Sequence, residues 1–379
     1  MDYVSTPLIK VMVVFGTRPE ALKLAPVIKG LLARSSRFHT QLCVTGQHRE
    51  MLDQVLKMFS LEPDSDLNLM EPAQSLAEFA ARALVGLNRI FESSRPDVVI
   101  VQGDTTTSFV AALAAYYNRV RVAHVEAGLR SFERYAPFPE ELNRGLTTKL
   151  ADFHFAPTVR ARENLLREGV PPEKIFVTGN TIVDALSEIS AKLDAGELRP
   201  ELQNRIGPLP EKYIVVTAHR RENHGPHLRD ICTAVLELSE RLPDFHFFYP
   251  VHLNPEVQNI ASELLGHSSH IHLLPPLDYL SFVWLMRHSA LILSDSGGVQ
   301  EESPTLGKRV LVMREVTERP EAVDSGYALL VGPHRERIIK AALELLSDGL
   351  GPAVSLKNPF GDGRASERIV SILERLSAC

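Results

Sequence analysis

Short runs of hydrophobic residues recur along the whole chain and are separated by stretches with helical periodicity. The runs are rich in Val, Ile and Phe and alternate little between polar and apolar residues, which is typical of strands buried on both faces of a parallel sheet. The predicted strands form a first series at residues 9–15, 40–46, 97–103, 121–127, 152–158 and 174–179, and a second series at residues 213–219, 245–251, 270–276, 290–296, 309–314 and 328–332. This pattern predicts an α/β protein with two doubly wound, Rossmann-like halves.

The segments between these runs carry apolar residues at helical spacing. Residues 75–94 place such residues three and four positions apart, which makes a stripe along one face of a helix. Pro19 suits the first position of the helix that follows residues 9–15, whereas Pro26 is expected to kink or split that helix. Residues 363–378 indicate an amphipathic helix at the end of the chain.

The length of 379 residues favours two domains over one packed core. A polar stretch that contains proline and glycine, residues 191–213, lies between the two strand series, and the linker is expected near it. We assign residues 1–180 to an N-terminal domain and residues 181–362 to a C-terminal domain.

Composition narrows the class of protein. The chain is 44% hydrophobic and 23% charged, with a net charge of −6, so it lacks the basic excess that binding to nucleic acid needs. Cys43, Cys232 and Cys379 are too few and too far apart for a disulfide framework or a metal site, which fits a reducing compartment. No apolar run approaches the roughly 18 residues of a membrane span, and the N-terminus is unlike a signal peptide. We therefore expect a cytoplasmic protein that does not bind membranes.

The stretch SDSGGVQEE follows a predicted strand and begins a helix. Gly297 and Gly298 have no side chains to keep an anion away from the unpaired N–H groups of a helix start, and Ser296 can cap the helix and donate its hydroxyl. Glu301 or Glu302 could then accept hydrogen bonds from two ribose hydroxyls. These features suit a nucleoside diphosphate; the alternative is a capped helix with a solvated acidic pair. No G-x-G-x-x-G motif accompanies a strand, so no nicotinamide cofactor is expected.

Two basic residues follow the first strand. Arg18 comes just after the turn and Lys23 about one helical turn later, so both could pair with phosphate. A helix start with ordinary surface charges is the alternative.

Carboxylates follow several strands of the first series. Asp104 and Glu126 come at two strand ends, and Glu140 and Glu141 follow in the segment PFPEELNR. Ends of parallel strands meet at one edge of a sheet, so we expect these acids to converge, and burial and mutual repulsion would then raise their pKa values toward neutrality. Alternatively, Asp104 is a helix cap and the paired acids favour a helix N-terminus.

Histidines also occur at strand ends. His219 follows the first strand of the second series, where it could hydrogen-bond or protonate a departing diphosphate. His252 follows the next strand, and His48 lies in TGQHRE. None has the spacing of metal ligands, so no catalytic metal is expected.

Taken together and in order, the motifs resemble those of the non-hydrolysing UDP-N-acetylglucosamine 2-epimerases of bacteria. The resemblance spans roughly residues 9–332 and rests on FGTRPEALKLAPV, TGQHREML, QGDTTT, HVEAGLRS, PFPEELNR, GNTIVDAL, TAHRREN, YPVHLNP, SDSGGVQEE, GKRVLVMR and TERPEAV. It implies a fold of the glycosyltransferase-B type with the UDP-sugar in the interdomain cleft. It also implies a homodimer, and a C-terminal helix, residues 363–379, that crosses back onto the first domain.

The resemblance also implies roles for individual residues. The catalytic group would be Asp104, Glu126, Glu140 and His219. The contacts with the UDP-sugar would come from Arg18, Lys23, Asp104, Glu126, His219, Leu277, Phe282, Ser296, Gly297, Gly298, Glu302 and Arg319. Phe282 would pack on uracil, and Leu277 stands where some members have Gln, so its contact would use backbone atoms. A second UDP-N-acetylglucosamine, bound as an activator, would contact Gln47, His48, Glu141, Arg220 and His252.

The reaction that this resemblance implies inverts C2 of the sugar. The proton at C2 is poorly acidic and no cofactor is expected to oxidise a neighbouring carbon, so the implied route is elimination of UDP followed by re-addition, with carboxylates as base and acid. Other functions stay open: a 2-epimerase for a related sugar such as a UDP-di-N-acetylglucuronate, a glycosyltransferase of the same architecture, a hydrolysing epimerase or a non-catalytic sensor.

Overall fold

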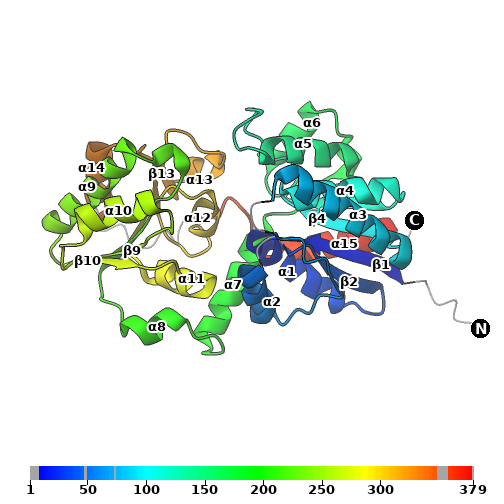
Figure 1. The fold of residues 1–379 in the computed structure, drawn as a ribbon, viewed down its shortest axis with the longest axis horizontal. Helices are drawn as coiled ribbons and strands as arrows, with labels where there is room; N and C mark the ends of the chain where they lie inside the picture. The colour runs from blue at the N-terminus through cyan, green and yellow to red at the C-terminus, as the bar shows by residue number, and fades with distance from the viewer. Residues whose placement is uncertain (1–7, 47–48, 72–73, 348–356, 378–379) are drawn as a thin grey trace, which may run out of the picture. The chain divides into compact units, whose positions relative to one another are not determined.

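The computed structural model describes residues 8–46, 49–71, 74–347 and 357–377. The chain divides into two compact units, Met1–Ala185 with Gly361–Cys379, and Leu186–Phe360, here called the first and second units. Each unit contains one parallel sheet with helices around it (Figure 1). No helix in the described ranges is both long enough and apolar enough to cross a lipid bilayer.

The first unit contains a sheet of seven parallel strands in the order β3-β2-β1-β4-β5-β6-β7. Its strands are β1 (Ile9–Phe15), β2 (Phe38–Val44), β3 (Ser65–Asp66), β4 (Val98–Gln102), β5 (Arg121–Val125), β6 (Phe153–Ala156) and β7 (Ile175–Val177). Its helices are α1 (Arg18–Leu32), α2 (Arg49–Phe59), α3 (Leu76–Ser94), α4 (Thr106–Tyr117), α5 (Glu140–Leu150), α6 (Val159–Arg167), the 3-10 helix η1 (Pro172–Lys174) and α15 (Ala365–Ser377). The strand order reverses between β1 and β4, so the loops that follow these two strands diverge where ligands of such sheets bind.

The second unit contains six parallel strands in the order β10-β9-β8-β11-β12-β13. Its strands are β8 (Tyr213–Thr217), β9 (His246–Pro250), β10 (Ile271–Leu274), β11 (Leu291–Ser294), β12 (Val310–Val312) and β13 (Ala328–Leu330). Its helices are α8 (Glu201–Ile206), the 3-10 helix η2 (Arg221–Asn223), α9 (Pro226–Arg241), α10 (Pro255–Leu265), α11 (Tyr279–His288), α12 (Gly297–Glu302), α13 (Pro320–Asp324) and α14 (Arg335–Ser347). Helix α7 (Thr181–Asp194) continues from the first unit into the second. Here the order reverses between β8 and β11.

The core of the first unit explains its strand pattern. Alternate residues of β1, Met12 and Val14, pack in one cluster with α3 and α4, whereas Val11 and Val13 are equally buried and point to the opposite face. The apolar stripe of α3 supplies four buried side chains to that cluster, Phe79, Ala83, Leu87 and Phe91. Burial on both faces is why these strands show no alternation in sequence.

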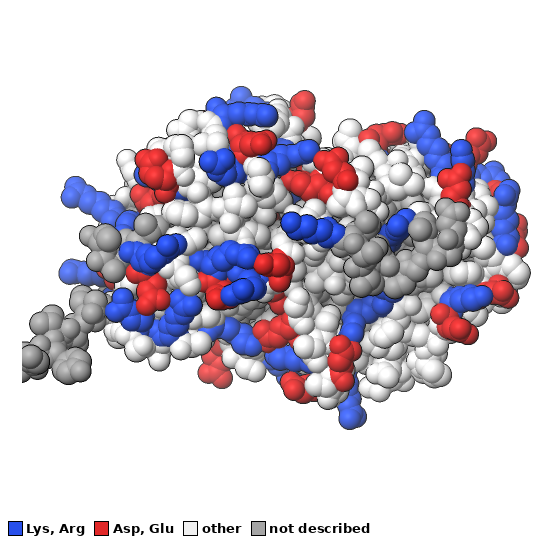
Figure 2. All heavy atoms as spheres, turned by 180° about the vertical axis from the view of Figure 1, so that it is seen from behind, with Lys and Arg blue, Asp and Glu red and all other residues white. Residues whose placement is uncertain are grey.

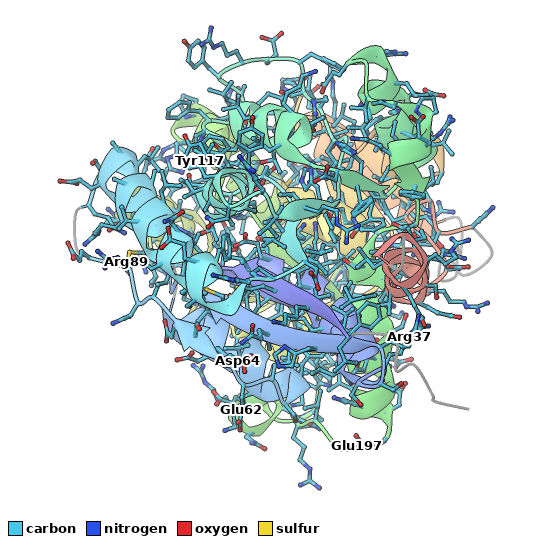
Figure 3. All side chains as sticks on the ribbon, turned by 90° about the vertical axis from the view of Figure 1, so that its right-hand side faces the viewer. Arg37, Glu62, Asp64, Arg89, Tyr117 and Glu197 are labelled. Carbon is cyan, nitrogen blue, oxygen red and sulfur yellow. The ribbon has the colours of Figure 1, made fainter. Side chains whose placement is uncertain are left out.

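The C-terminal helix α15 packs against α1 of the first unit. Glu374 accepts hydrogen bonds from Arg34 at 3.0 Å and from Arg37 at 2.9 Å, and Figure 3 shows Arg37 beside this helix. At the other end of α15, the buried carboxylate of Asp184 accepts hydrogen bonds from the backbone N–H groups of Ala365 and Ser366, at 3.2 and 2.8 Å.

Each predicted strand is confirmed within three residues at its ends. The short strand β3 was not predicted, because two residues of polar character make no apolar run. Of the kink or split expected at Pro26, the split is wrong, since α1 continues unbroken from Arg18 to Leu32. Proline removes one intrahelical hydrogen bond, but the buried residues on both sides of Pro26 hold the helix against its neighbours.

Candidate functional site

The loop after β1 is fixed by one buried carboxylate. Glu20 Oε2 accepts hydrogen bonds from the backbone N–H groups of Gly16 and Thr17 at 3.0 and 2.8 Å, and Oε1 accepts from the hydroxyls of Thr105 and Ser108 at 2.7 and 3.0 Å. Burial raises the pKa of Glu20, and these hydrogen bonds oppose the rise. The carboxylate thereby joins the loop before Arg18 to the loop that follows β4.

Lys23 and Glu126 form an ion pair in which both side chains are nearly buried, with 11% and 8% of their surface exposed. Lys23 lies in α1, and Glu126 follows β5 with a left-handed backbone, φ 66°. A Cβ at Gly103, after β4, would lie 3.9 Å from Glu126 Oε1, so this carboxylate lies against the residue that precedes Asp104.

Asp104 has its own cation, the buried Arg144 of α5. Arg144 also lies 3.4 Å from Glu141, whose two carboxylate oxygens accept the backbone N–H groups of Ser131 and Phe132 at 3.0 Å each. One buried guanidinium therefore connects the carboxylate after β4 to the loop that precedes α5.

The first unit thus brings Lys23, Asp104, Glu126 and Glu141 into two adjoining ion-pair groups. The expected environment differs in one respect: Asp104 and Glu126 are each paired with a cation, so their surroundings are not set by mutual repulsion. Glu140 is half-buried in the first turn of α5, and Arg18 is half-buried at the first position of α1.

The second unit places another buried carboxylate beneath the loop after β8. Asp295, which follows β11, is fully buried. Its Oδ2 accepts hydrogen bonds from the backbone N–H groups of His219 and Arg220, both at 2.9 Å, and from Asn223 Nδ2 at 3.0 Å. This carboxylate fixes the main chain at both candidate residues of that loop.

The ring of His219 stacks on His252, with ring centroids 5.7 Å apart and an angle of 16° between the planes. Burial lowers the pKa of His219; Asp295, 3.4 Å from its Nδ1, opposes that change, and Arg220 adds to it. His252 itself is exposed.

The Ser-Gly-Gly turn begins α12 as predicted, and Ser296 occupies the N-cap position. Its side chain makes no capping hydrogen bond, so that part of the prediction is wrong. A Cβ at Gly297 would lie 3.5 Å from Arg220 Nη2 and 3.9 Å from Arg319 Cζ, whereas Gly298 is exposed. Two guanidinium groups therefore adjoin the backbone at which an anion is expected, which favours binding of phosphate.

The acids at the end of this helix are not a solvated pair. Glu301 and Glu302 are 2% and 8% exposed. Glu301 accepts a hydrogen bond from Arg319 at 2.6 Å, and Glu302 accepts one from the hydroxyl of Tyr279 at 3.0 Å. The interpretation as surface acids is therefore wrong.

The remaining candidates lie near α11 or outside the described ranges. Leu277 and Phe282 are both half-buried, before α11 and in its first turn. Tyr279, which lies between them in the chain, donates its hydroxyl to Glu302 at the end of α12. Gln47 and His48 lie outside the described residues.

Sequence reasoning missed Glu20, Arg144 and Asp295 as positioning groups. All three are buried, and each contacts candidate residues or their loops through the hydrogen bonds and ion pairs given above. Their only sequence signal is a charged residue within a motif already singled out, which does not reveal the partner.

Charges on the face drawn in Figure 2 are interspersed rather than gathered into one basic area.

Two parallel sheets, each with charged residues after the strands where its order reverses, define a two-domain α/β protein of the glycosyltransferase-B type. A family model for UDP-N-acetylglucosamine 2-epimerase matches residues 31–374. The UDP-N-acetylglucosamine 2-epimerase of Yersinia pestis is 50% identical over 370 residues, 96% of this chain and 98% of that protein.

Solved structures give the same result. The UDP-GlcNAc 2-epimerase of Neisseria meningitidis, crystallised with UDP-GlcNAc, is 46% identical with a TM-score of 0.90 and covers 97% of this chain and 100% of its own. The enzyme of Methanocaldococcus jannaschii, in complex with UDP-GlcNAc and UDP, is 36% identical with a TM-score of 0.82 over 97% and 100%. The chain belongs to the UDP-N-acetylglucosamine 2-epimerase family and is an isomerase.

Proposed function

We propose that this enzyme interconverts UDP-N-acetylglucosamine and UDP-N-acetylmannosamine by eliminating UDP and adding it back through a glycal-like intermediate. The observation that carries the proposal is the arrangement in the second unit. Arg220 and Arg319 adjoin Gly297, and Asp295, next to Ser296 in the chain, accepts a hydrogen bond from the backbone of His219. Such a site can stabilise the negative charge that develops on a departing diphosphate.

The chemistry at C2 is assigned to the first unit. A carboxylate removes the C2 proton, the C1–O bond breaks, and its electron pair leaves with UDP while C1 and C2 become doubly bonded. Return of the proton to the opposite face of C2 and re-attack of UDP at C1 complete the inversion. Asp104, Glu126 and Glu140 are the candidates for base and acid. Arg144 pairs with Asp104, and Lys23 pairs with Glu126.

The substrate contacts are assigned from the same motifs. Arg18 and Lys23 would bind phosphate, Ser296, Gly297 and Gly298 would offer N–H groups to it, and Glu302 would accept the ribose hydroxyls. The tyrosine hydroxyl on Glu302 supports this last role, because its hydrogen bond to Oε1 orients the carboxylate. Phe282 would pack on uracil.

We also propose that a second UDP-N-acetylglucosamine binds beside the substrate as an activator. Support comes from proximity: Arg220 adjoins Gly297, His252 stacks on His219, and Glu141 shares Arg144 with Asp104. From the resemblance of the motifs, we further propose that the enzyme forms a homodimer and takes part in the synthesis of bacterial surface polysaccharide.

The test is incubation of the enzyme with UDP-N-acetylglucosamine alone in D₂O. We expect the mannosamine epimer to form without an acceptor, with deuterium at C2 and without accumulation of free UDP. Product without deuterium would exclude the mechanism, free UDP would indicate a hydrolysing enzyme, and no conversion until an acceptor is added would indicate a glycosyltransferase. Faster conversion of a UDP-di-N-acetylglucuronate would reassign the substrate.

Two variants test the catalytic roles. Asp104→Asn and Glu126→Gln should each abolish epimerisation while leaving much of the affinity for UDP, measured by calorimetry. Near-wild-type turnover in both variants would remove these residues from the mechanism.

A further inference from the structure

Asp295 is fully buried, yet within the described part of the chain only one of its two carboxylate oxygens accepts hydrogen bonds. Oδ2 accepts three hydrogen bonds, two of them from the backbone of His219 and Arg220 and one from Asn223. Oδ1 has no hydrogen-bond partner among the residues that the structure describes. A buried carboxylate oxygen without a donor is costly, so a nearby donor is strongly favoured to turn toward it.

The ring of His219 supplies that donor. Its Nδ1 lies 3.4 Å from Oδ1, within the range of an ion pair and slightly longer than a hydrogen bond. The backbone N–H of the same residue is already bonded to Oδ2, so the histidine is held to the carboxylate at its main chain while the ring lies over the other oxygen. A small rotation of the ring completes the second bond, as commonly happens when a site closes on its substrate.

We propose that Asp295 is a positioning residue that holds His219 with Nδ1–H directed at the carboxylate, so that Nε2 is the nitrogen that carries a proton to the departing diphosphate. The inference rests on the function proposed above for His219. Because Ser296 is the next residue in the chain, the carboxylate that orients the ring and the backbone expected to bind the diphosphate are fixed relative to each other.

The proton balance of the step is simple. As the C1–O bond breaks, the Nε2 proton of the imidazolium is shared with or passed to a phosphate oxygen of UDP, and it returns when UDP adds back to C1. The Nδ1 proton stays between the ring and Asp295, which remains ionised throughout. An orienting carboxylate of this kind fixes the tautomer and stabilises the imidazolium without taking up a proton itself.

The charged groups around the ring explain why the carboxylate is needed. Arg220 lies next in the chain, His252 stacks on the ring from the loop after β9, and His224 comes from the segment after η2. Burial and these three groups lower the pKa of His219, and Asp295 is the group that raises it. Without the carboxylate, the imidazolium would be lost at lower pH.

The first measurement uses the wild-type protein. Nitrogen-15 labelling of its 14 histidines, with His219→Gln to identify the signal, reports the tautomer of His219 with and without UDP. We expect the Nδ1–H form when the ring is neutral. The Nε2–H form would overturn the proposal, and this measurement decides it even if the substitutions below prevent folding.

The second measurement uses Asp295→Asn, which keeps the shape of the side chain and removes its charge. We expect kcat to fall at least about 10-fold with KM changed less than about twofold, by comparison with other carboxylates that orient a histidine. The limb of the pH profile on which activity is lost as pH rises should move to lower pH, since removing the carboxylate lowers the pKa of His219. Adding Asp295→Asn to His219→Gln should slow the enzyme no further.

Asp184→Asn is the matched control, because Asp184 is also buried and its carboxylate also accepts three hydrogen bonds, one of them from the hydroxyl of Ser366. It should lower the melting temperature and leave kcat, the pH profile and the His219 signal unchanged. An unchanged pH profile and tautomer in Asp295→Asn, or multiplying losses in the double variant, would assign Asp295 a purely structural role. Full activity of His219→Gln would instead contradict the proposed function of that histidine, while the tautomer still decides the contact.

Discussion

The ion pair between Lys23 and Glu126 should stabilise the first unit far more than a surface pair would. Both side chains are nearly buried, at 11% and 8% exposure, so removing one partner takes the opposite charge away from the other in a poorly solvated place. Removing one member of a buried pair costs about 3–5 kcal/mol. Allowing for the remaining exposure, we expect Lys23→Met and Glu126→Gln each to lower the free energy of unfolding by about 2–4 kcal/mol.

The double variant should lose much less free energy of unfolding than the two single variants lose together. Neither Met nor Gln carries a charge that needs a partner, so we expect a coupling free energy of about 2–3 kcal/mol in the double-mutant cycle. Urea unfolding followed by far-UV circular dichroism measures it. Fluorescence of the single tryptophan, Trp284, is unsuitable because this residue lies in the second unit.

A matched control lies in the same unit. Arg364 and Glu367 form an ion pair at 2.9 Å whose side chains are 64% and 54% exposed, and removing both should reveal no measurable coupling, because solvent screens such pairs. If the effects of Lys23→Met and Glu126→Gln add to within about 0.5 kcal/mol, burial does not strengthen this pair and the reasoning is refuted.

Three further predictions concern buried positions. Burial raises the pKa of Glu20 above its usual 4.5, so protonation of Glu20 stabilises the fold at low pH, and this contribution is lost as pH rises through the raised pKa. Glu20→Gln should therefore flatten that part of the curve of unfolding free energy against pH, measured by chemical denaturation. An unchanged curve would refute this reasoning. Gly297→Ala adds a Cβ with ordinary contacts at 3.5 and 3.9 Å, so the melting temperature should hold while calorimetry shows weaker binding of UDP. Gly145→Ala, whose Cβ would meet no atom within 4 Å among the described residues outside its own stretch of helix, should leave that affinity unchanged. Gly128→Ala would force φ +92° on alanine and place its Cβ 2.2 Å from the carbonyl oxygen of Ala161, so it should destabilise the first unit by more than about 3 kcal/mol in thermal unfolding, and a smaller loss would mean that α6 can move away.

The regular elements of both sheets could be predicted because their cause is local. A strand buried on both faces needs an unbroken apolar run, and each run assigned to a strand from the sequence became one. The two-residue strand β3 has no such run. It forms because its backbone pairs with β2, which the sequence does not reveal. Proline favours a break in a helix, but the buried residues around Pro26 keep α1 continuous there.

The candidate site was only partly predictable for the same reason. Residues such as His219 and Asp104 could be singled out because position after a strand is readable from the chain. Their partners Asp295 and Arg144 lie 76 and 40 positions away, and nothing in the sequence specifies which of many charged residues will meet.

The sequence by itself determined the alternation of strands and helices, the division into two α/β halves and the family, because periodicity and ordered motifs are properties of the chain. Only the tertiary structure decided that the acids are paired with cations, that Glu301 and Glu302 are buried, and that one carboxylate lies beneath His219. These depend on which side chains are brought together out of water, where the energy of a charge is set by its neighbours in space.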